Sequence, residues 1–176
     1  MTTTKSELAD FENARKQFVE AMNGVPTEAL TYPSPGDDYA LGGLVTHVNA
    51  ILRRYGRVLD AILADPTTEL DAQPIDADKD VENARSIEGP TGATHDAAMA
   101  TLAELHQHVA TGLATVGEAD WNRKTPVVFG GSGGRPYPTG AADIKTWLTD
   151  HYFEHVPHVA ELLQGWRAAT VDAQAG

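Results

Sequence analysis

Four stretches of this chain place apolar residues at intervals of three and four, the spacing of amphipathic helices, and this periodicity restricts the chain to a helical fold. The stretches cover about residues 4–23, 39–64, 94–116 and 143–167. Asp37 or Asp38 precedes the second stretch and can cap its helix. We see no strong strand pattern. We therefore expect an all-α four-helix bundle whose two long connections leave room for a non-simple topology.

The connections differ from the helices in composition. The segment 65–90 is rich in carboxylates and poor in large apolar residues, so we expect an irregular surface segment with at most a short helical turn at 80–85. Gly130–Gly134 lacks the Gly-Lys-Ser/Thr ending and the preceding strand of a phosphate-binding loop, and we interpret it as a flexible connection that can act as a lid. We assign 1–168 to a single domain and 169–176 to a flexible C-terminal tail.

Composition narrows the classes of function. The chain has no cysteine, which excludes disulfides, thiolate metal sites and a thiol nucleophile of its own. No apolar run is long enough to span a membrane, and residues 1–12 do not resemble a signal peptide, so we expect a cytoplasmic protein. A net charge of −12 disfavours nucleic acid as a partner, because phosphate binding depends on clustered Lys and Arg.

The fourth helical stretch carries histidines in the middle of its apolar stripe. His151 and His155 are four residues apart, so they lie on one face one turn apart and can share a metal ion. His158 is seven residues beyond His151, roughly 10 Å along the axis at about 1.5 Å per residue, and cannot readily join both. Pro157 interrupts the hydrogen bonding of this stretch, and we expect a kink there rather than a break, because the apolar stripe keeps its phase.

A third ligand has to come from another segment, and His47 lies on the inward side of the second helical stretch. Three neutral imidazoles leave a divalent ion its full charge and an open position, which is typical of catalytic rather than structural sites. The alternative is a metal-free bundle in which these residues are ordinary core histidines. We expect His95, His106 and His108 to lie on the surface.

Two further residues bear on the site. Residues 151–155 also match the His-x-x-Glu-His motif of inverted zinc peptidases, in which Glu154 would be the general base; alternatively, Glu154 orients a ligand imidazole. Arg54 lies two turns after His47 on the same face, where it either receives an anionic group of a substrate or extends to solvent from the helix interface.

Two segments resemble the DinB/YfiT-like superfamily. Residues 35–47, Pro-Gly-Asp-Asp-Tyr-Ala-Leu-Gly-Gly-Leu-Val-Thr-His, resemble the turn and helix that carry the first histidine of that superfamily. Residues 151–159, His-Tyr-Phe-Glu-His-Val-Pro-His-Val, resemble its His-x-x-x-His stretch. The spacing between the segments and the approach of Asp120-Trp121 to the glycine loop also fit, so the resemblance spans nearly the whole chain.

The resemblance implies an up-down-down-up four-helix bundle, often a homodimer, with zinc or nickel held at one end by His47, His151 and His155. It also implies mycothiol, bacillithiol or glutathione as cofactor or co-substrate of an isomerase or S-transferase acting on a small-molecule substrate. The chain departs from the pattern twice. The related mycothiol-dependent maleylpyruvate isomerases have Glu where His151 stands, and His158 replaces a common Gln, so we place His158 in the second shell or the core.

We therefore expect a metal-dependent, thiol-using S-transferase or isomerase. Two alternatives remain open. One is a metal-binding or interaction module without turnover, and the other is a metal-dependent hydrolase in which the same three histidines hold a nucleophilic water.

Overall fold

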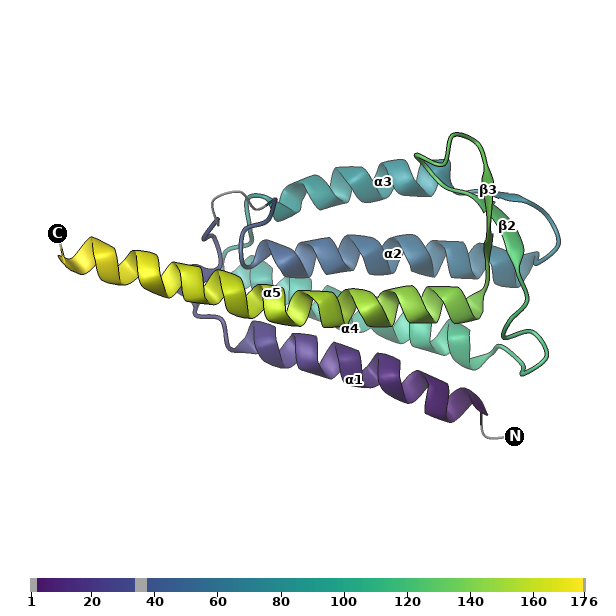
Figure 1. Cartoon of the computed structure of the whole chain (residues 1–176), viewed down its shortest axis with the longest axis horizontal. Helices are drawn as coiled ribbons and strands as arrows, with labels where there is room; N and C mark the ends of the chain where they lie inside the picture. Colours follow the sequence, from purple (N-terminus) through teal and green to yellow (C-terminus); the bar gives the residue numbers. More distant parts are fainter. Residues whose placement is uncertain (1–2, 34–37, 176) are drawn as a thin grey trace.

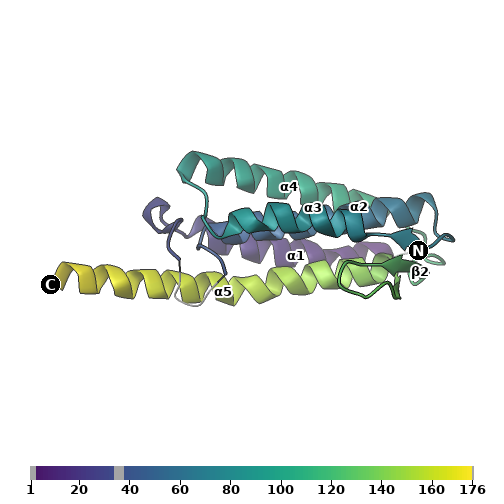
Figure 2. The same ribbon diagram turned by 90° about the horizontal axis from the view of Figure 1, so that it is seen from above.

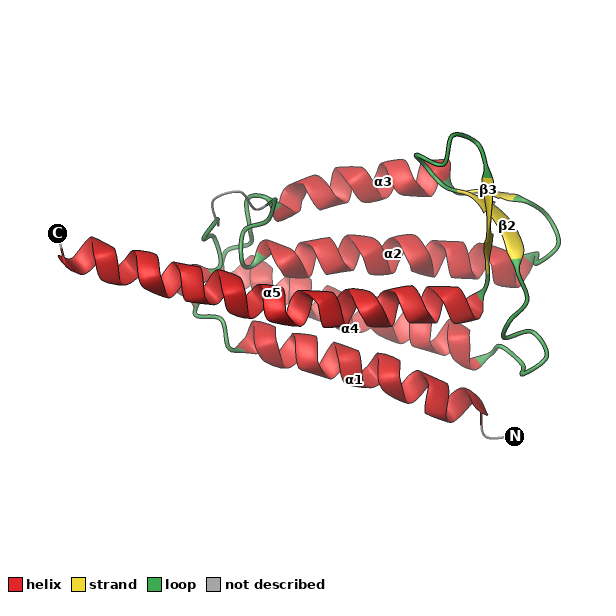
Figure 3. Cartoon of the chain, viewed as in Figure 1, coloured by secondary structure: helices red, strands yellow, loops and turns green. Residues whose placement is uncertain are grey.

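The computed structural model describes residues 3–33 and 38–175, and the side chains of 8–33 and 38–173. It is predominantly helical, as expected from the apolar periodicity, and a small sheet lies at one end of the bundle (Figures 1 and 3). The elements, in chain order, are α1 (Thr3–Asn23), the 3₁₀ turn η1 (Thr27–Ala29), α2 (Gly43–Ala64), β1 (Leu70–Asp71), α3 (Gln73–Asn83), the 3₁₀ turn η2 (Ala84–Ser86), α4 (Gly92–Ala114), β2 (Thr125–Val128), β3 (Pro136–Thr139) and α5 (Ala141–Ala175).

The four long helices have the predicted up-down-down-up order. In Figure 1, α1 and α5 run away from the end that carries the sheet, whereas α2 and α4 run toward it. Consecutive parallel helices need a return path, and α3 provides it by running back along α2 before α4 begins. Helices α1 and α5 pack together, as do α2 and α4, and α2 also contacts α5. The topology therefore brings α2 and α5 side by side.

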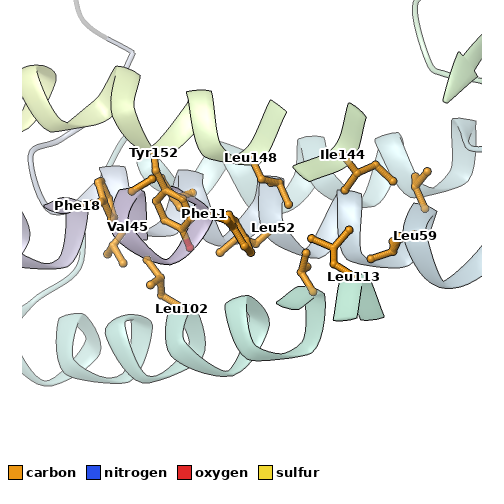
Figure 4. Close-up of a cluster of buried hydrophobic side chains, with 14 of the residues drawn as sticks. Phe11, Phe18, Val45, Leu52, Leu59, Leu102, Leu113, Ile144, Leu148 and Tyr152 are labelled. Carbon is orange, nitrogen blue, oxygen red and sulfur yellow. The ribbon is translucent and has the colours of Figure 1, made fainter. Parts of the chain in front are cut away.

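The core lies mainly between the four long helices and consists largely of the apolar residues whose spacing predicts those helices. Residues of the connections also belong to it, namely Ala72, Ile75, Trp121 and Val127. Phe11 and Phe18 of α1 lie against Tyr152 of α5, and Leu52 of α2 belongs to the same buried cluster (Figure 4). These side chains are completely or almost completely buried. Burying each large apolar side chain contributes about 1.5–3 kcal/mol to the stability of the bundle.

The interpretation of 65–90 as irregular is wrong. This segment contains an eleven-residue helix, α3, and a two-residue strand, β1. Only Ile75 and Asp76 of α3 are buried, so the helix lacks a broad apolar face. It is attached to α2 by three ion pairs instead, Arg53–Glu82, Arg54–Asp76 and Arg57–Asp78. A helix held largely by charge pairs has no apolar periodicity by which the sequence could reveal it.

The connection between α4 and α5 contains strands that the sequence analysis does not predict. Strands β2 and β3 form an antiparallel hairpin, and β1 pairs with β2 in parallel. Gly131, Gly133 and Gly134 have positive φ angles in the hairpin turn, a conformation that glycine adopts without steric cost. The predicted glycine loop is thus a hairpin turn.

Two helix boundaries also differ from expectation. The N-cap of α2 is Gly42, so Asp38 does not cap it, and Asp37 lies outside the described residues. Helix α5 is a single helix that continues through Pro157, which agrees with the expected continuity and excludes a break. It also extends through Ala175, so most of the segment 169–176 is helical rather than a tail, and this part projects beyond the bundle (Figure 2). None of the described helices combines the length and the apolar character that crossing a membrane requires.

Candidate metal centre

The packing of α2 against α5 brings three predicted ligands together. His47 comes from α2, and His151 and His155 come from successive turns of α5. Each offers one ring nitrogen such that the three atoms lie within 4.8 Å of one another. His47 and His155 are buried, and His151 is half-buried. The three side chains can therefore hold one metal ion.

Asn83 determines which nitrogen of His47 carries the proton. Its Oδ1 lies 2.6 Å from Nδ1 of His47, and an amide oxygen only accepts hydrogen bonds. The Nδ1–H of His47 therefore donates to Asn83, which leaves the lone pair of Nε2 available to a metal. Asn83 is the last residue of α3. Its contact with His47 depends on how α3 packs against α2, so the sequence does not predict it.

The two histidines of α5 also have polar neighbours. Nδ1 of His151 lies 4.0 Å from Oε2 of Glu154, and its buried Nε2 has no hydrogen-bond partner. Nδ1 of His155 lies 3.3 Å from Nδ1 of His158, a distance at which one nitrogen can donate a hydrogen bond to the other. A proton on Nδ1 of His155 leaves its Nε2 as a metal-binding atom. Glu154 and His158 thus lie next to two of the predicted ligands.

Burial favours the neutral form of His47 and His151. Loss of solvation lowers the pKa of His47, although the hydrogen bond to Asn83 opposes this shift. For His151, burial, followed by the proximity of His155 and His47, lowers the pKa to about 3. Neutral imidazole is the form that binds metals.

The residues present fit a divalent metal. A buried polar atom without a partner, such as Nε2 of His151, costs about 1–3 kcal/mol of stability, and coordination would remove that cost. Three imidazole donors without thiolate suit zinc and nickel, among other transition metals.

A cavity of about 420 Å³ lies over the three histidines. Beyond them, its lining consists of Tyr39, Glu154, Pro157, His158 and Glu161. The Tyr39 ring lies 4.6 Å from that of His47, between centroids, and 6.3 Å from that of His155. The cavity is large enough for a small molecule to reach the histidine cluster.

Arg54 does not line this cavity. Its guanidinium pairs with the buried carboxylate of Asp76, donates to the Tyr55 hydroxyl at 2.8 Å, and lies over the rings of Tyr55 and Phe129. Asp76 also accepts a hydrogen bond from the backbone N–H of Gly130. Arg54 therefore neither extends freely to solvent nor faces the histidine cluster. It connects α2, α3 and the hairpin.

The expectation that three other histidines lie on the surface is correct only for His108. His95 and His106 are buried. His106 Nε2 donates to the Glu12 carboxylate at 2.8 Å, its Nδ1 lies 3.3 Å from the Tyr152 hydroxyl, and its ring stacks on Phe11. Glu12 and Tyr152 come from other helices, so a polar residue on α4 becomes part of the core through partners that its own helix does not supply.

Comparison with known protein families identifies the fold. Residues 10–159 match the model of the DinB superfamily. The chain belongs to the DinB superfamily. Comparisons with curated proteins and with solved structures gave no significant match. The matched region contains the whole histidine cluster, together with Asn83, Glu154 and His158, and stops before the projecting end of α5.

Proposed function

We propose that this DinB-superfamily protein is a metal-dependent enzyme, an S-transferase or isomerase that uses an external low-molecular-weight thiol. The observation that supports the proposal is the cluster of three histidine nitrogens within 4.8 Å of one another beneath a cavity of about 420 Å³. In the same proposal the ion is zinc or nickel, and the thiol is mycothiol, bacillithiol or glutathione. The protein is proposed to be a cytoplasmic homodimer.

In this proposal His47, His151 and His155 hold the ion, and Asn83 holds His47 in the tautomer that binds it. A divalent ion in this site would lower the pKa of an external thiol and thereby supply a thiolate at neutral pH. The thiol has to come from outside, because the chain has no cysteine. Burial lowers the pKa values of His47 and His151, so protons compete less with the ion for these two ligands.

Metal-dependent hydrolysis is the second candidate, and the position of Glu154 favours it. Its side chain lines the cavity and is exposed, so it can take a proton from a water molecule there.

A binding module without turnover has the same geometry, and only an activity measurement distinguishes it from the two enzymes.

The first experiment is elemental analysis of protein purified without a histidine tag or chelator. We expect close to one ion per chain in the wild type and loss of the ion in the His47→Ala/His151→Ala variant. His108→Ala is the matched control, since His108 is exposed and lies on α4 outside the cluster. Absence of metal in the wild type, and of uptake from added zinc or nickel, would refute the metal site.

The second experiment uses Co²⁺ as a spectroscopic probe. Because the chain contains no cysteine, a sulfur-to-cobalt charge-transfer band can arise only from an added thiol. We expect that band with a low-molecular-weight thiol and thiol-dependent conjugation or isomerisation across a panel of electrophiles. Hydrolysis of ester or amide substrates without any thiol effect would support the second candidate instead.

A further inference from the structure

The cavity over the histidine cluster has an acidic rim. Glu154 and Glu161 are seven residues apart on α5, hence on the same face two turns apart, and both carboxylates are exposed at the cavity. Among the described residues that line it, none is Lys or Arg. The described part of the lining therefore contains two carboxylates and neither a Lys nor an Arg side chain.

Lys79 of α3 and Arg53 of α2 pair with carboxylates outside the cavity lining. Lys79 lies near enough to His47 to lower its pKa, but its ammonium is 2.6 Å from the carboxylate of Asp80. Arg53 pairs with Glu82 at 3.0 Å, and Arg53, Lys79 and Glu82 line a separate small hollow. Glu154 acts on the pKa of His47 in the opposite direction to Lys79, and more weakly. Both of these cations thus pair with carboxylates that do not line the cavity.

We propose that this rim, Glu154 and Glu161, selects the thiol ligand by charge. The site then accepts thiols whose remaining groups are neutral or positively charged, and it disfavours thiols that carry carboxylates. The inference rests on the proposed function, because the ligand is taken to be a thiol that reaches the metal. Of the thiols considered above, glutathione and bacillithiol carry carboxylates, whereas mycothiol carries none. A carboxylate-free thiol of this kind is the expected co-substrate.

The test compares three small thiols of similar size on the Co²⁺-loaded protein at low ionic strength. The probes are 2-mercaptoethylamine, 2-mercaptoethanol and 3-mercaptopropionate, and the charge-transfer band reports binding of each. Two carboxylates a few ångströms from the ligand's charge, partly screened, should favour the cationic over the anionic probe by about tenfold. Intrinsic differences in thiol pKa cancel when the same ratio is compared between protein variants.

The decisive variant is Glu154→Gln/Glu161→Gln, which removes both charges and keeps the side-chain shape. The ratio of cationic to anionic affinity should fall by about tenfold. Glu161→Gln alone should give part of this fall and does not alter the neighbour of His151. Glu20→Gln/Glu104→Gln is the control, since it removes the same net charge from exposed positions on α1 and α4.

The outcomes separate the two proposals. An unchanged ratio in the double variant, or an equal fall in the control, would overturn charge selection by the rim while thiol binding and the proposed function stand. Failure of all three thiols to produce the band would overturn the proposed function, and charge selection with it. A ratio that falls only when the rim carboxylates are removed would support the inference.

Discussion

At the scale of single residues, the histidine cluster depends on where each imidazole carries its proton. A histidine binds a metal through a nitrogen that has no proton, so its other nitrogen has to carry one and needs an acceptor. For His47 that acceptor is Asn83, at 2.6 Å. Asn83 also accepts from the Ser86 hydroxyl at 3.1 Å, which helps to hold the amide in place.

Asn83→Ala should therefore weaken zinc binding by about 10–100-fold, the usual effect of losing such a partner. The variant keeps all three ligands but leaves the tautomer of His47 unconstrained. Asn83→Asp, which retains the acceptor oxygen, should stay closer to the wild type. Competition with a chromophoric chelator measures both affinities, and an Asn83→Ala affinity equal to that of the wild type would show that the hydrogen bond does not orient the ligand.

At the scale of elements, α3 serves two purposes. It returns the chain to the end of the bundle at which α4 begins, and its final residue reaches His47. Its ion pairs with α2 differ in burial. The side chains of Arg54 and Asp76 are 15% and 8% exposed, whereas those of Arg57 and Asp78 are 45% and 67% exposed. The buried pair should therefore contribute most to docking of α3 and the hairpin.

Asp76→Ala should destabilise the protein by about 3–5 kcal/mol, because it leaves Arg54 buried without a counter-ion. It also removes the acceptor for the backbone N–H of Gly130. Asp78→Ala, the matched control on the same helix, should cost only about 0–1 kcal/mol. Urea-induced unfolding of both variants measures the difference, and similar losses in the two would contradict this ranking of the ion pairs.

The start of α2 depends on the small size of Gly43. A Cβ at this position would overlap the carbonyl oxygen of Ser86, which belongs to the backbone of η2 and cannot rotate away. Gly43→Ala should therefore move η2 away from α2, lower the stability and weaken zinc binding through Asn83. Gly56→Ala, in the same helix, would meet its nearest neighbours at 3.4–3.5 Å and should be neutral or stabilising by up to about 1 kcal/mol. Equal unfolding midpoints for the two variants would contradict the clash.

At the scale of the whole molecule, buried histidines couple the fold to pH. Burial lowers the pKa values of His47, His106 and His151 in the folded state, and that of His151 falls to about 3. In the unfolded chain the same residues have pKa values of about 6.5. Below that pH the unfolded state binds protons that the folded state does not, so folding stability decreases as pH falls.

The metal-free protein should accordingly lose stability between about pH 6.5 and about pH 5, by up to about 1.4 kcal/mol per pH unit for each histidine that stays neutral. Urea unfolding across this range measures the slope. His106→Gln should reduce the slope, whereas His108→Gln, at an exposed position, should not. Stability that is independent of pH in this range would show that these histidines are protonated in the folded state.

The sequence alone predicts the four long helices, because apolar spacing reports which face of each helix is buried. It also predicts that His151 and His155 share a face, since their four-residue separation is a local property of one helix. The inward position of His47 on the second helical stretch makes it a candidate third ligand, and the family resemblance implies the same residue and the up-down-down-up order. These predictions depend on periodicity and on short motifs, and neither requires knowledge of what lies across the bundle.

Tertiary structure decides the features that depend on pairs of distant residues. Helix α3 is attached to α2 largely by charge pairs, the hairpin is closed by glycines, and Asn83 reaches His47 from 36 positions away. Arg54 pairs with Asp76 of α3 and therefore does not face the cavity. His106 pairs with Glu12 of α1 and is therefore part of the core. Polar contacts of this kind have no periodicity in the sequence, because one side chain does not encode the distance to its partner.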